Sequence, residues 1–229
     1  MKKKRIIIIL AFIVVVLTGC ANNANPKEVA TAFINNVIYG QDKEAAEKYF
    51  YQLDAPSEKD LIQDFSELFD LSKEQAKELA TIYQERLEKE TSFSIKMNDR
   101  TGKKQEAQVT VIGLDSTKFD QIIDQKTDEE LVLWLKKKGY DTIRTIEDID
   151  KISDENQLNG ILKELDALND KDLNQIQFEA LKKTFKELKA DKEPKTIHLE
   201  LEPDKKEKNY WIIVDEEKRF NELLDAFQG

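Results

Sequence analysis

Cysteine and histidine are almost absent from this chain of 229 residues, which contains one of each, Cys20 and His198. A single thiol cannot form an internal disulfide, so packing and hydrogen bonds must hold the fold together. One cysteine and one histidine are also too few ligands for a structural zinc site. The sequence has neither a glycine-rich phosphate loop nor a Gly-x-Ser-x-Gly elbow, so it does not indicate the enzyme folds that use them.

Glycine and proline are scarce as well, with 7 and 4 residues, and this favours helix throughout the chain. Basic residues are outnumbered, because 36 Lys and Arg face 46 Asp and Glu, for a net charge of -10. An acidic surface repels the phosphates of nucleic acids, so we expect no nucleic-acid partner. Charges of both signs are interleaved along the chain, which is typical of solvated helix faces.

The first nineteen residues have the pattern of a secretory signal. Lys2, Lys3, Lys4 and Arg5 precede an unbroken apolar run from Ile6 to Leu17. Twelve helical residues cover about 18 Å at ~1.5 Å per residue, whereas a bilayer core is ~30 Å thick. The run is therefore interpreted as a signal peptide. The alternative is an uncleaved membrane anchor.

The end of this signal, Leu17-Thr18-Gly19-Cys20, resembles the lipobox of bacterial lipoproteins. The resemblance implies that Cys20 receives diacylglycerol and becomes the first mature residue. Two acyl chains, such as palmitate, hold a protein stably on a membrane, at ~0.8 kcal/mol per buried CH₂. We therefore expect a lipid-anchored protein on the extracytoplasmic face of the cell membrane. Covalent diacylglycerol is the only cofactor that the sequence implies.

After Asn25, apolar residues recur at helical spacing, with interruptions where they alternate with polar ones. The alternation around Phe93–Met97 and Ala107–Val111 predicts a hairpin of two half-buried strands. It returns at Ile197–Leu201, and Tyr210–Val214 is a fourth strand, apolar on both faces. The predicted order is helices, hairpin, helices, hairpin, helix. Two hairpins that join into one antiparallel sheet under long helices make an α+β domain.

Helix starts carry recognisable signals. Asn25-Pro26 predicts a capped start, Ser72 with Gln75 a capping box, and the acidic run 128–130 another helix N-terminus. The domain organisation that follows has a signal peptide at 1–19 and a lipidated tether at 20–25. A single α+β domain then covers 26–229, with a helical insertion at about 116–189.

Two stretches resemble a known group of domains. The first is the hairpin Phe93–Val111 with Gly113-Leu114-Asp115, and the second runs from Tyr210 to Phe227. They are similar to uncharacterised cell-envelope lipoproteins of Gram-positive bacteria with an NTF2-like (cystatin-like) domain. This resemblance implies a bent antiparallel sheet wrapped around an N-terminal helix. The group includes both enzymes and binding modules, so it implies no activity.

Candidate functional residues are few. His198 is predicted on the Thr196/Glu200 face of a strand, as a surface residue or, alternatively, a general base. Acidic residues gather at Asp148–Asp150 and at 166–172, but without the glycine of a calcium loop, so they are interpreted as caps and turns. No metal site is expected. Trp134 and Trp211 are core residues or, alternatively, line a ligand-binding cleft.

Three hypotheses about function follow. The first is a non-enzymatic, membrane-anchored module that binds a small ligand or another surface protein. The second is a hydrolase that uses carboxylates alone, which would require two converging acids with separated pKa values. The third concerns the discarded signal, because Phe12–Gly19 is similar to signal fragments that act as peptide pheromones.

Overall fold

The computed structural model describes residues 24–53, 55–98, 104–207 and 209–229. Its elements follow the predicted order of helices, hairpin, helices, hairpin and helix, and the α+β class is confirmed. The first half contains α1 (Pro26–Tyr39), α2 (Lys43–Tyr49), α3 (Glu58–Leu68), α4 (Lys73–Glu90), β1 (Ser92–Asn98) and β2 (Gln105–Ile112). The second half contains α5 (Phe119–Lys137), the 3₁₀ helix η2 (Ile146–Lys151), α6 (Glu155–Asp166), α7 (Asp170–Glu187), β3 (Lys195–Pro203), β4 (Trp211–Ile213) and α8 (Glu216–Gln228).

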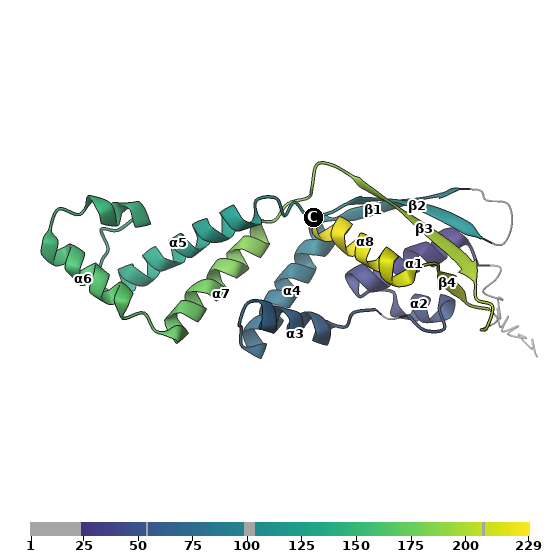
Figure 1. Cartoon of the computed structure of the whole chain (residues 1–229), viewed down its shortest axis with the longest axis horizontal. Helices are drawn as coiled ribbons and strands as arrows, with labels where there is room; N and C mark the ends of the chain where they lie inside the picture. Colours follow the sequence, from purple (N-terminus) through teal and green to yellow (C-terminus); the bar gives the residue numbers. More distant parts are fainter. Residues whose placement is uncertain (1–23, 54, 99–103, 208) are drawn as a thin grey trace, which may run out of the picture.

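The two hairpins form one antiparallel sheet in the order β1-β2-β3-β4. Val109 of β2 lies opposite Ile95 on one side and Ile197 on the other, which joins the hairpins along one apolar face. Helices α1 and α8 cover this face (Figure 1). The other face carries exposed polar side chains such as Lys96 and His198. The alternation of the sequence therefore separates a packed face from a solvated one.

Helix starts form where the sequence predicts them, except in α5. The Asn25 side chain accepts a hydrogen bond from the Lys27 N–H (3.0 Å), and Ser72 and Gln75 form the reciprocal capping box. Residues 128–130, in contrast, lie inside α5, which begins at Phe119 without a side-chain cap. The prediction of a helix start there is wrong. These acids are stabilised by basic partners instead: Glu129 pairs with Lys126, and Glu130 pairs with Lys183 of α7 (2.6 Å).

Two apolar cores divide the molecule. The larger one lies between the sheet and α1, α4 and α8, and includes Phe33, Leu79 and Phe227. The smaller one lies at the outer end of the long arm that α5, α6 and α7 form (Figure 1), and is built from Val132, Leu135, Ile143, Ile149 and Ile161. The root of the arm belongs to the larger core, because Phe178, Leu181 and Phe185 of α7 are buried there.

The arm leaves and rejoins the sheet at one junction. Asp191 N–H donates to the Gly113 carbonyl (2.8 Å), and Asp115 N–H donates to the Lys189 carbonyl (2.8 Å). The end of α8 meets the same junction, where Leu114 N–H donates to the Phe227 carbonyl (2.9 Å). These bonds fix the end of α8 relative to the sheet and so position one wall of the candidate site.

Candidate ligand-binding cavity

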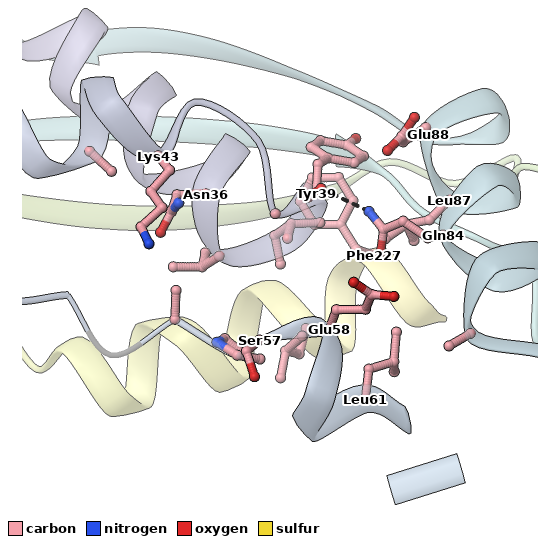
Figure 2. Close-up of a pocket in the computed structure, with 18 of the residues that line it drawn as sticks. Asn36, Tyr39, Lys43, Ser57, Glu58, Leu61, Gln84, Leu87, Glu88 and Phe227 are labelled. Carbon is pink, nitrogen blue, oxygen red and sulfur yellow. Dashed lines mark hydrogen bonds between the residues drawn. The ribbon is translucent and has the colours of Figure 1, made fainter. Parts of the chain in front are cut away.

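A cavity of about 830 Å³ lies where α1, α2, α3, α4 and α8 meet (Figure 2). Its size falls within the range of roughly 300–1,000 Å³ that is usual for small-molecule sites. The cavity opens to solvent, and its floor belongs to the main core. It is therefore the candidate functional site of this chain.

Tight turns separate the helices that surround the cavity. α1 ends at Gly40, whose left-handed backbone (φ 63°) turns the chain, and Asp42 (φ 55°) turns it again into α2. α3 is capped by Ser57, which forms a capping box with Asp60. The chain thus forms two helical corners, α1–α2 and α3–α4, and the cavity lies between them.

The floor of the cavity is apolar. Phe227 of α8 is fully buried, and its ring meets the ring of Tyr39 edge-on, with 5.6 Å between centroids. The other apolar lining residues include Val37, Ile38, Phe50, Leu61, Leu87 and Leu224. A ligand with an apolar body would gain free energy by leaving water for this surface.

Two tyrosines supply fixed polar groups beside this floor. The Tyr39 hydroxyl is 2.8 Å from Thr91 Oγ1, and the Tyr39 carbonyl accepts from Gln84 Nε2 (2.9 Å), as the dashed line in Figure 2 shows. Burial raises the pKa of Tyr39, and the nearby Glu88 carboxylate raises it further. Burial raises the pKa of Tyr83 to about 12. Both phenols therefore remain uncharged at neutral pH.

The rim of the cavity is acidic. Five of the lining residues are carboxylic acids, namely Glu47, Glu58, Asp64, Glu85 and Glu88. Among the lining residues that the structure describes, Lys43 is the one cation, and it lies 3.8 Å from Glu47. Within the described ranges, no ion pair links the other four acids to a lysine or arginine. The rim therefore carries an excess of negative charge around an apolar floor.

Trp134 and Trp211, the two tryptophans considered as ligand-binding residues, lie outside the cavity. Trp211 is buried in β4 as part of the main core, with 4% of its surface exposed. Trp134 is half-buried against the smaller core of the arm, and Lys138 Nζ lies 4.8 Å from its ring centroid. Neither residue lines the cavity.

His198 lies on the open polar face of the sheet, as its position in the strand predicts. Its Nδ1 is 2.8 Å from Glu106 Oε1 of the neighbouring strand, and 54% of its side chain is exposed. Neither His198 nor Glu106 lines the cavity.

The acidic clusters cap helices, as the sequence predicts. Asp148 forms a capping box with Thr145, and hydrogen bonds from Lys151, Arg144 N–H and Thr145 N–H lower its pKa. Asn169 caps α7 by accepting from Asp172 N–H (3.0 Å). In the part of the chain that the structure describes, no group of three or more His, Cys, Asp or Glu residues is arranged to hold a metal ion. Cys20 and the lipobox residues Leu17, Thr18 and Gly19 lie outside the described residues, as does Phe12.

The cavity could not be located from the sequence. Its lining comes from residues 36–53, 55–64, 80–88 and 224–228, which only the fold brings together. The one local hint was the spacing of Glu85 and Glu88, which places both acids on one side of α4 beside Thr81 and Gln84.

Comparison with known proteins identifies a likeness of fold. No protein-family model and no curated protein sequence matches this chain. A crystal structure that is similar is that of a protein provisionally described as a lipoprotein (ycdA) from Bacillus subtilis subsp. subtilis str. 168. The two share a TM-score of 0.54 at 13% identity, over 89% of this chain. This chain spans 56% of the length of that structure, so the likeness concerns the fold and part of that protein.

In the residues that the structure describes, every helix is too short or too polar to cross a bilayer.

Proposed function

We propose that this protein is a membrane-anchored lipoprotein on the extracytoplasmic face of the cell membrane, held there by diacylglycerol on Cys20. The support is the basic start, the short apolar run and the lipobox Leu17–Cys20. The fold is also similar to that of a protein described as a lipoprotein. A diacylated cysteine provides two chains, which is enough for stable attachment.

The anchor can be tested directly. Cys20→Ala removes the thiol that would be acylated, so the variant should leave the membrane fraction or accumulate as an unprocessed precursor. Membrane fractionation and mass spectrometry of the mature N-terminus measure this change. Recovery of the unmodified protein with Met1 intact and a free thiol would contradict the proposal.

We further propose that the exported domain is a non-enzymatic binding module for a small ligand with an apolar body. The observation that carries this proposal is the cavity of about 830 Å³ with its apolar floor. The half-buried side chains of Leu61 and Leu224 offer an apolar surface above Phe227, while Tyr39 and Gln84 offer polar groups that orient a ligand. An NTF2-like arrangement, with a sheet packed around α1, remains part of the same proposal and is supported by the contacts of α1 with β1, β2 and β3.

Binding of neutral alcohols tests this activity. The full chain is placed in nanodiscs of zwitterionic lipid and titrated calorimetrically with 1-hexanol and 1-octanol, with empty nanodiscs as the reference. Two further methylenes are worth ~0.8 kcal/mol each when buried, so the Kd should fall about fifteenfold from hexanol to octanol.

A filled cavity provides the control. Ala80, which is 3% exposed, lines the cavity, so Ala80→Leu should remove alcohol binding by occupying the same space. Lys77→Leu adds the same side chain to an exposed position on the same helix and should change nothing. Urea unfolding of both variants shows whether they remain folded. Equal binding by Ala80→Leu and the wild type would place the ligand elsewhere and contradict the proposal.

A further inference from the structure

From the charges on its rim, we infer that the cavity selects a small amphipathic cation, with an apolar chain or ring on the floor and an ammonium or guanidinium group at the rim. This inference rests on the proposed binding function and adds the chemical class of the ligand. The charges of the rim, their positions and the apolar floor support it.

The rim of the cavity carries more negative than positive charge. Lys43 is balanced by Glu47 at 3.8 Å, which leaves Glu58, Asp64, Glu85 and Glu88 without a basic partner in the described part of the chain. Unlike charges across an interface fix the orientation and choice of a ligand more than they add to its affinity. Anions would meet like charge at this rim, whereas a cation would meet complementary charge.

Two of the acids lie away from the one cation of the described rim. Figure 2 shows Glu58 at the start of α3 and Glu88 on α4, both on the side of the view away from Lys43, the first residue of α2. The Glu58 side chain points from the start of α3 into the cavity, toward Phe227. A cationic group should therefore lie between Glu58 and Glu88, with the apolar body extending along the floor toward α2.

Glu88 acts on the interior of the site as well as on its rim. Its charge raises the pKa of Tyr39, whose ring packs against Phe227 at the floor. The electrostatic effect of Glu88 therefore extends to the hydroxyl of a ring that packs on the floor. Because the rim is open to water, the carboxylates keep their hydration when the site is empty, so they impose no large cost on the free protein.

Octylammonium, 1-octanol and octanoate form a matched series of probes, since they share a chain and differ in charge. We titrate each into the full chain in zwitterionic nanodiscs, with empty nanodiscs as the reference, at low and at high NaCl. Exposed ion pairs contribute an amount equivalent to about 1.4- to 5-fold in Kd. Octylammonium should therefore bind several-fold more tightly than octanol, and octanoate more weakly. The advantage of the amine should shrink in high salt, where the Debye length is only a few ångströms.

Variants that each remove one charge show which carboxylates produce the preference for a cation. Glu58→Gln and Glu88→Gln should each lower the ratio of octylammonium affinity to octanol affinity by about 1.4- to 5-fold. Glu74→Gln on the exposed first turn of α4 is the control and should change neither. Lys43→Gln should leave octylammonium as tight or make it slightly tighter.

The possible outcomes separate this inference from the binding function. If octanol binds and octylammonium binds no more tightly, the selection of cations is refuted while the binding function stands. If none of the three probes binds, the binding function itself fails. If the amine is favoured but Glu58→Gln and Glu88→Gln do not reduce that preference, the charge acts at another place and the inference is overturned.

Discussion

Gly113 allows the closest approach between the sheet and the end of α8, so we expect Gly113→Ala to destabilise the fold strongly. A methyl group at this position would lie 2.0 Å from the Ala226 carbonyl oxygen and 3.0 Å from the Phe227 carbonyl oxygen. Both atoms belong to the backbone and cannot rotate away. Either the end of α8 or the junction must shift.

The magnitude follows from two contributions. Overpacking of a tight site costs about 1–3 kcal/mol. A shift that breaks the Leu114 N–H···O=C Phe227 bond (2.9 Å) leaves a buried donor, because Leu114 is 1% exposed. An unsatisfied buried donor costs roughly 1–3 kcal/mol more. We therefore expect the free energy of unfolding to fall by about 2–6 kcal/mol.

Urea unfolding measures this loss, and a second glycine provides the comparison. Gly160 lies inside α6, where an added methyl group would meet only the Tyr140 hydroxyl at 2.8 Å, the end of a side chain that can move. Alanine is favoured over glycine inside helices by about 0.5–1 kcal/mol, so Gly160→Ala should be neutral or stabilising. A loss below 0.5 kcal/mol for Gly113→Ala would refute the argument from close approach.

Two other changes test the burial of aromatic residues. Tyr83 has a pKa raised to about 12, so the folded protein retains this proton where an unfolded tyrosine has lost it, and stability should fall by about 1.4 kcal/mol per pH unit from pH 10 to pH 12. Urea midpoints at pH 9, 10 and 11 should show a smaller decline in Tyr83→Phe, and equal slopes would disagree with this prediction. Trp211→Ala should cost about 3–5 kcal/mol because the side chain is buried, and Trp134→Ala should cost less. Neither tryptophan variant should alter octanol binding. Weaker octanol binding by either variant would show that the substituted residue belongs to the binding site.

Local patterns in the sequence predicted the elements well. The cap at Asn25, the capping box of Ser72 and Gln75, and the face on which His198 lies depend only on residues a few positions apart. Each of these predictions is confirmed, because the hydrogen bonds and the alternation that create the pattern form within one element.

The ends of two elements could not be predicted from the same patterns. The predicted strand at Tyr210–Val214 is shorter in the structure, since Asn209 and Asp215 adopt left-handed backbone angles (φ 85° and 55°) on either side of β4. It is also not apolar-packed on both faces, because 38% of Ile212 is exposed. Ile212 lies opposite Glu202 on the solvated face of the sheet, the face that also carries His198. The interior position of residues 128–130 in α5 depends on Lys183, which is contributed by another helix.

The cavity could not be predicted from the sequence, because the packing of distant helices decides which residues line it. Val37, Leu61, Leu87 and Phe227 each appear in the sequence as ordinary members of an apolar stripe. Nothing in such a stripe distinguishes a residue that fills the core from one that faces a space left between helices. Distances between α1, α3 and α8 decide this, and they depend on the turns at Gly40 and Asp42.

The base of the arm packs directly against the wall of the cavity. Phe185 of α7 contacts Phe119 of α5 at 5.5 Å, and it contacts Phe65 and Tyr83 at 5.6 Å each. Tyr83 also lines the cavity, so ring-to-ring contacts run from both long helices of the arm to the cavity wall. The root of the arm and the wall of the cavity therefore share Tyr83, so a change in how α5 and α7 pack against the main core would reach that wall.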